Sequence, residues 1–108
     1  MAKLEQTVRG DFQTILRRIE KGILNGSISA SLEDSSDFTD GAARVSVRVF
    51  ERYSYMGNNR VSLNVTLFQV GDGPVRLSAI TSGGSQAVFF KINTFGEEAF
   101  LDKLREVL

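Results

Sequence analysis

The chain has 108 residues, 42% of them hydrophobic and 24% charged, a composition typical of one small globular domain. Cysteine and histidine are both missing, which excludes disulfides, thiolate metal sites, cysteine nucleophiles and every catalytic triad built on histidine. The 13 basic and 13 acidic residues cancel, which argues against non-specific binding of nucleic acid. No stretch resembles a membrane span or a signal peptide, so we expect a cytoplasmic protein without membrane contact.

The first elements in chain order are a short strand, over residues 4–8, and a helix. The stretch DFQTILRRIEKGIL has apolar residues at helical spacing: Phe12, Ile15, Leu16, Ile19 and Ile23. Asp11 has the side chain of an N-cap, and Gly22 or Gly26 is expected to end the helix. One face of this helix is therefore predicted to cover an apolar core.

Apolar and polar residues then alternate in five stretches, which predicts five strands: residues 28–32, 45–49, 61–67, 77–79 and 88–92. A second helix is expected at the end, with Thr94 and Glu97 as a capping box. Its apolar face comprises Phe100, Leu101, Leu104 and Leu108. We predict a single α+β domain over residues 1–108, with a mostly antiparallel sheet of five to six strands, two helices on one face and the order β-α-β-β-β-β-β-α.

Loop lengths predict the register, because side chains alternate and a hairpin must bring apolar residues to the same face of both strands. Gly84-Ser85 is expected to form a two-residue loop that pairs Ala79 with Phe90, since a phosphate-binding loop would lead into a helix rather than a strand. A three-residue loop, Gly57-Asn58-Asn59, pairs Val49 with Leu67. A five-residue loop, Gly71 to Val75, pairs Leu67 with Ala79.

These registers predict that the sheet face away from the helices mixes aromatic residues with cations. We predict this face as the binding surface, formed by Arg48, Phe50, Arg52, Phe68, Ile80, Phe89 and Lys91. Two copies meeting face to face would bury its apolar row, so a homodimer is the expected assembly. A nucleic-acid interface is the alternative for the same residues, although the sequence lacks the motifs of base-stacking sheets.

Two further candidates are acidic. Glu51 is predicted on the helix-facing side of the sheet, where a carboxylate could act as an acid or base, or pair with an arginine of the first helix. Residues 33–40, EDSSDFTD, are expected to form a solvated loop whose oxygen donors could alternatively hold a divalent cation. We predict no catalytic, cofactor-binding or metal-binding residue from these patterns.

Three runs carry a resemblance to a known family: GILNGSISASLEDSSDF, RVFERYSYMGNNRVSLNVTL and LSAITSGGSQAVFFKINTFGEEAFL. They are similar to a family of small bacterial proteins of unknown function, about this length, found mainly in Firmicutes. The resemblance covers nearly the whole chain and implies no activity.

The expected function is therefore non-enzymatic binding or self-association, through the exposed sheet face or a groove between helix and sheet. The expected partner is a second copy, another protein or a small apolar ligand. The alternative is a small enzyme that uses Glu51 or the acidic segment 33–40.

Overall fold

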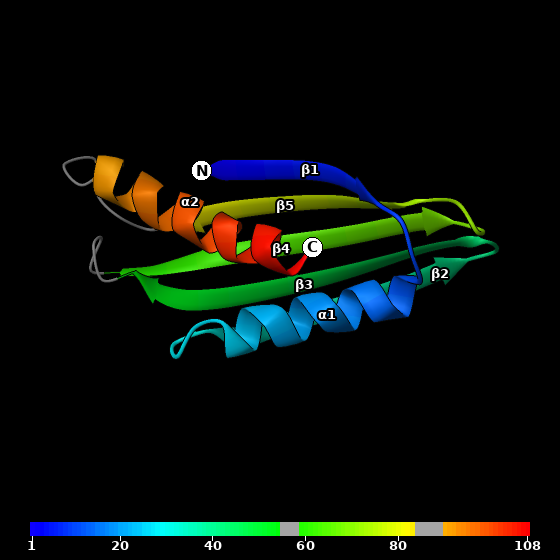
Figure 1. Cartoon of the computed structure of the whole chain (residues 1–108), viewed down its shortest axis with the longest axis horizontal. Helices are drawn as coiled ribbons and strands as arrows, with labels where there is room; N and C mark the ends of the chain where they lie inside the picture. Colours follow the sequence, from blue (N-terminus) through cyan, green and yellow to red (C-terminus); the bar gives the residue numbers. More distant parts are fainter. Residues whose placement is uncertain (55–58, 84–89) are drawn as a thin grey trace.

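The structure is a computed structural model that describes residues 1–54, 59–83 and 90–108, and within these residues it has five strands and two helices (Figure 1). The elements in chain order are β1 (Ala2–Val8), α1 (Phe12–Asn25), β2 (Ser31–Asp40), β3 (Ala43–Ser54), β4 (Asn59–Val70), β5 (Val75–Gly83) and α2 (Phe90–Val107).

The strands form one antiparallel sheet in the order β1-β5-β4-β3-β2, so that β1 and β2 are its edges. Both helices lie on the same face, α1 along β3 and β2 and α2 across β5 and β4 (Figure 1). The predicted α+β class, the antiparallel sheet and the placement of the helices are confirmed. The first strand, Ala2–Val8, pairs with β5, for example Leu4 with Ala79.

Helix α1 forms where its apolar stripe predicts it. All five stripe residues are buried, from Phe12 to Ile23. Asp11 is the N-cap, as predicted, and its carboxylate accepts hydrogen bonds from the Thr14 backbone N–H and hydroxyl, both at 2.9 Å. Gly26 is the C-cap, and its N–H donates to the Gly22 carbonyl. The two caps fix the length of the helix over the sheet.

Helix α2 buries Phe100, Leu101 and Leu104, as predicted, but it begins at Phe90. Residues 90–92, expected at the end of a strand, are therefore helical, and Thr94 lies inside the helix instead of capping it. The carboxylate of the buried Glu97 forms an ion pair with the Met1 amino group, with 2.8 Å between nitrogen and oxygen. The predicted Gly84-Ser85 hairpin lies outside the described residues. A helix follows that segment, so the argument that a strand must follow it is wrong.

The core lies between the helices and the three strands that they cover most closely. β4 contributes Val61, Leu63, Val65 and Leu67, and all four side chains are fully buried. β5 contributes Val75, Leu77 and Ala79, whereas β3 contributes one large apolar residue, Phe50. The core is thus centred on β4 and β5, and it thins out toward β2.

The acidic segment predicted as a loop is a strand, and this prediction was wrong. Ser31–Asp40 forms β2 and pairs with β3, with a bulge between Leu32 and Asp34, whereas Ile28 of the predicted strand is fully exposed. Gly41 has φ +57° in the two-residue turn that follows, a conformation that glycine adopts without strain. Nearly every residue of β2 is exposed, and a charged, bulged edge strand resists pairing with other chains.

The β3–β4 register differs from the prediction by three positions. Val49 pairs with Asn64 instead of Leu67, because the strands are already paired at Ser54 and Asn59. An odd shift transfers every side chain to the opposite face. The β4–β5 register differs by two positions, since Leu67 pairs with Leu77, and there the predicted faces are retained.

Candidate binding face

The predicted binding surface is divided between the two faces of the sheet. Arg48, Phe50 and Arg52 lie on the face under the helices, and Phe50 is fully buried in the core. Phe68 and Ile80 lie on the opposite face, each 42% exposed. Phe89 is outside the described residues, and the side chain of Lys91 is not described, although that residue lies in α2. The predicted combination of Arg48 and Arg52 with Phe68 on one surface is therefore wrong.

The three inward arginines of β3 attach the sheet to the helices, and we call them the arginine row: Arg44, Arg48 and Arg52. The Arg44 guanidinium lies 4.2 Å from the centre of the Phe12 ring in α1, and that of Arg52 lies 4.7 Å from the centre of the Phe100 ring in α2. Such contacts are favourable where water is partly excluded. The row thus contacts both helices.

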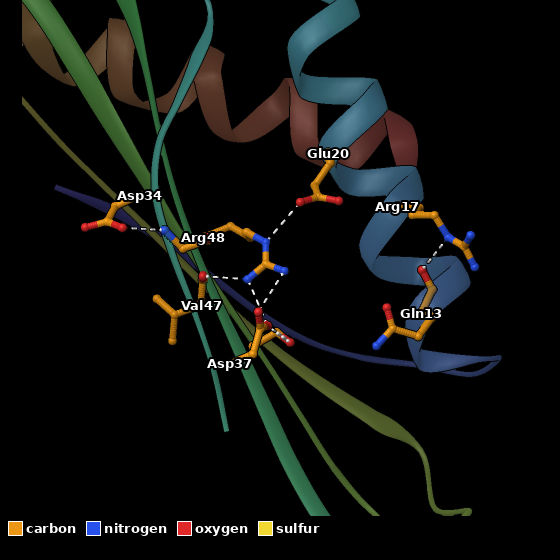
Figure 2. Close-up of polar contacts among 9 residues, drawn as sticks. Gln13, Arg17, Glu20, Asp34, Asp37, Val47 and Arg48 are labelled. Carbon is orange, nitrogen blue, oxygen red and sulfur yellow. Dashed lines mark hydrogen bonds and ion pairs between the residues drawn. The ribbon is translucent and has the colours of Figure 1, made fainter. Parts of the chain in front are cut away.

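Arg48 is the most buried member of the arginine row and joins three elements (Figure 2). Its Nε donates to Glu20 of α1 at 3.0 Å, and its NH1 group donates to Asp37 of β2 at 3.0 Å and to the Val47 carbonyl at 2.9 Å. Ser46 donates its hydroxyl hydrogen to the same Asp37 oxygen at 2.6 Å. The guanidinium therefore connects the edge strand β2 to the helix layer.

The electrostatics of this cluster favour its ionised form. Hydrogen bonds from Ser46 and Arg48 lower the pKa of Asp37 below its usual value. Burial alone lowers the pKa of Arg48, but the hydrogen bonds to Asp37 and Glu20 outweigh that effect and raise it. Burial also lowers the pKa of the Arg52 guanidinium, which stays charged at neutral pH. Because the donors of Arg48 are already used by Glu20, Asp37 and Val47, its arrangement is that of a structural anchor.

Both acidic candidates occupy other positions than predicted. Glu51 lies on the face away from the helices, where it accepts a hydrogen bond from Arg60 at 2.9 Å. In β2, Asp34 and Asp40 point to that same face, whereas Asp37 points toward the helices. The described part of the chain contains no group of three acidic residues that could hold a metal ion. Glu51 is thus neither helix-facing nor buried.

The face of the sheet away from the helices, which we call the open face, is covered by no element within the described residues (Figure 1). Its centre is a continuous apolar patch built from three strands: Phe38, Val45, Val47, Val49, Phe68 and Val70. Ile80 of β5 is exposed on the same face but lies apart from the patch, between Asn64 and Lys3. Phe38 is 65% exposed and Val70 is 55% exposed. Since isolated surface hydrophobes are normal but contiguous ones mark interaction sites, this apolar patch is the strongest candidate site.

Polar and charged groups surround the apolar patch. Lys3 and Glu5 of β1 form an ion pair at 3.4 Å on one side, beyond Arg76 of β5. Asp34 and Asp40 lie on the other side, on β2. A groove of about 390 Å³ crosses β1, β5 and β4 beside the patch, with Thr66 and Ser78 in its lining. The open face therefore has an apolar centre, an acidic edge at β2, and Arg76 beside an ion pair toward β5 and β1.

Sequence reasoning missed most of the apolar patch. It assigned the three valines of β3 to the core, because their alternation alone does not tell which face is buried. It placed Phe38 in a loop, because the neighbouring residues are acidic and short. One signal in the sequence could have indicated the patch: an arginine recurs every four residues in β3, at Arg44, Arg48 and Arg52. These arginines occupy every second position on the inward face of the strand, opposite the acidic residues of β2 and α1.

The comparisons with known proteins identify the family of the chain. Residues 1–108 match the model of the family of unknown function DUF6054, and the chain belongs to this family. No curated protein and no solved structure matches it. Among the described residues, neither helix combines the length and apolarity needed to cross a membrane.

Proposed function

We propose that this member of DUF6054 is a non-enzymatic binding module of the cytoplasm that self-associates into a homodimer through its open face. The observation that carries the proposal is the apolar patch: Phe38, Phe68 and Val70 are all more than 40% exposed on one side of one sheet. Contiguous apolar surface of this kind is buried in most assemblies of soluble proteins.

The choice of a second copy as the partner is supported by the charges around the patch. One side of the open face is acidic, with Asp34 and Asp40, and the other side carries Arg76 beside the ion pair of Lys3 with Glu5. Asp40 and Arg76 form no ion pair within the described part of the chain. A surface with opposite charges on its two sides can complement itself, which a two-fold dimer requires.

The position of the aromatic residues supports a dimer of moderate affinity. Phe38, Val45 and Phe68 occupy one row across β2, β3 and β4. Large aromatic side chains near the centre of an interface contribute most of its binding energy. We therefore expect the truncation of Phe38 and Phe68 to remove most of the self-association.

Sedimentation equilibrium of the purified chain tests the proposal. The wild type should be dimeric at high micromolar concentration, and Phe38→Ser/Phe68→Ser should be monomeric at the same concentration. Ile28→Ser is the matched control, because Ile28 is fully exposed but lies away from the open face. It should leave the dimer unchanged.

Circular dichroism melts show whether the double variant is folded, as expected for residues with exposed side chains. A wild type that stays monomeric at high micromolar concentration would overturn the proposal. A folded double variant that is as dimeric as the wild type would show that the open face is not the interface.

A further inference from the structure

We infer that the two copies pack with their two-fold axis parallel to the strands and centred on β3, so that β3 lies over β3 of the second copy. This inference rests on the proposed homodimer and concerns the orientation of its subunits. In a face-to-face dimer the axis lies in the plane between the sheets, and its two limiting directions run along the strands and across them.

An axis across the strands brings together like charges. In that arrangement β2 lies over β2 of the second copy, and Asp34 and Asp40 of one copy face the same carboxylates of the other. Like charges placed opposite each other are destabilising. When the axis runs along β3, β2 of one copy lies over β4 of the second copy and no longer over β2. β4 carries no acidic residue on the open face.

The position of the apolar side chains centres the axis on β3. Phe38 and Phe68 flank Val45 in one row, one on each side of β3. A two-fold axis along β3 therefore places Phe38 over Phe68 of the second copy, and does so twice. An axis along β4 would pair Val49 with Ile80 and Asp34 with Lys3, although Lys3 already forms an ion pair with Glu5. The same axis would place Phe38 over Thr7, Val45 over Arg76 and Val47 over Ser78, so that three apolar side chains face polar ones.

The same arrangement brings polar groups around the patch together, except that Asp40 comes over Val70 of the second copy. Asp34 shares a row with Val49 and Asn64, so it comes over Asn64 of the second copy, a hydrogen-bond donor. Ser36 comes over Thr66. Arg76 lies one strand over and two residues along from Asp40 of the second copy, within reach of its long side chain. Arg76 and Asp40, neither of which forms an ion pair in the described part of the chain, thus become neighbours.

The contact area agrees with a reversible dimer. Three strands spaced about 4.8 Å apart, over about ten residues of roughly 3.3 Å each, give a projected contact of roughly 500 Å² per copy. This area is near the lower limit of specific interfaces. We therefore expect an equilibrium between monomer and dimer rather than a permanent assembly.

Cysteine crosslinking tests the axis, and the chain has no cysteine of its own to interfere. Ala43→Cys and Val49→Cys place thiols on the open face of β3, six residues apart. With the axis along β3, each variant faces itself across about 10 Å, whereas Ala43 and Val49 of different copies are separated by about 20 Å along the strand. A bis-maleimide with a spacer of about 8 Å suits the first separation but not the second.

Each single variant should then crosslink to itself, and a mixture of the two, distinguished by a tag on one, should give far fewer mixed products. Asn64→Cys on β4 and Ile28→Cys off the face should crosslink poorly. Mixed products that exceed the self-crosslinked ones would show an axis across the strands and overturn the inference. A strong Asn64→Cys product with weak β3 products would move the axis to β4 and overturn it too.

Sedimentation of the same variants separates the two proposals. Dimers that form but crosslink in another pattern contradict the axis alone, because the homodimer then stands. Monomers at high micromolar concentration contradict the homodimer itself, and the inference about the axis falls with it.

Discussion

Strands β3 and β4 are neighbours with the same alternation of apolar and polar residues, but they direct it oppositely. β4 places Val61, Leu63, Val65 and Leu67 toward the helices, all fully buried. β3 places Val45, Val47 and Val49 toward the open face and turns its arginines inward. The difference shows that the alternation of apolar and polar residues along a strand indicates only that one face of the strand is more apolar than the other. The layer above the strand decides which face is buried.

The layer above explains why the two strands differ. α2 lies over β4 and β5 and presents Phe100, Leu101 and Leu104, so apolar residues are favoured beneath it. Above β3, helix α1 presents the carboxylate of Glu20. The neighbouring strand β2 presents a second carboxylate, that of Asp37, on the same side of the sheet. A long cation such as Arg48 bridges these carboxylates while its methylene groups cover the edge of the core.

The largest expected effect concerns the inward side of β4. Leu63→Ala should destabilise the fold by about 2–5 kcal/mol, because it opens a cavity in a fully buried site. Val47→Ala on the outward side of β3 should cost less than about 1 kcal/mol, since the lost methyl groups are already partly in water. Chemical denaturation of the monomeric protein measures both values. Equal losses would contradict the assignment of opposite faces.

The next effect concerns the arginine row. Arg48→Leu should destabilise by about 1.5–3 kcal/mol, because it removes hydrogen bonds between charged groups that hold β2 to α1. Arg18→Leu on the exposed side of α1 is the control and should change the unfolding free energy little. A thermal melt of Arg48→Leu that coincides with the wild type would show that Arg48 is not an anchor.

A smaller effect should depend on pH. The lowered pKa of Asp37 means that its ionisation stabilises the folded state above the usual value of 3.8, and that this contribution is lost as the pH falls through the folded-state pKa. Asp37→Asn should therefore cost about 1 kcal/mol or less at neutral pH, because the carboxylate is 59% exposed.

The difference in stability between Asp37→Asn and the wild type should shrink below about pH 4, where the Asp37 carboxylate of the unfolded chain becomes protonated, and should be lost once the pH falls through the lowered folded-state pKa. Unfolding free energies at several pH values measure it. Asp11 also has a lowered pKa, from its hydrogen bonds to Thr14, so Asp11→Asn serves as a second acidic comparison. A constant difference across the acid range would contradict the role assigned to Asp37.

The smallest expected effect on stability is on the outward side of β3. Val47→Thr should change the unfolding free energy by no more than about 0.5 kcal/mol, because threonine retains the β-branch that favours a strand. It should nevertheless weaken the dimer, since it places a hydroxyl at the centre of the apolar patch. Sedimentation and denaturation of one preparation compare the two effects. A large loss of stability would indicate that Val47 is buried.

The sequence predicted the elements that rest on local signals. The apolar stripe and the caps of α1 are local, and the structure confirms both. The apolar face of α2 was found in the same way, but its start was not, because the pattern Thr94-x-x-Glu97 also occurs by chance within a helix. Local patterns therefore predicted the type of each element better than the residues at which it begins and ends.

The register could not be predicted from the same signals. A three-residue loop at Gly57-Asn58-Asn59 would pair valines of β3 with leucines of β4, which is self-consistent. The observed pairing of Ser54 with Asn59 instead places Arg48 beside Val65. The carboxylates of Glu20 and Asp37, distant in sequence, make the inward Arg48 favourable. The rings of Phe12 and Phe100, which lie in the helices, do so for Arg44 and Arg52. The prediction of the candidate site failed for this reason, since a shift of three positions exchanged the two faces of β3.

The pairing of β1 with β5 determines when each edge of the sheet can be completed during synthesis. Ala2 and Thr81 are 79 residues apart, yet the Ala2 N–H donates to the Thr81 hydroxyl. β2, β3, β4 and β5 each follow one another along the chain and can pair as soon as they leave the ribosome, because their contacts are local. β1 must instead wait for β5, so a strand that precedes β2, β3 and β4 in the chain pairs only after they have been made.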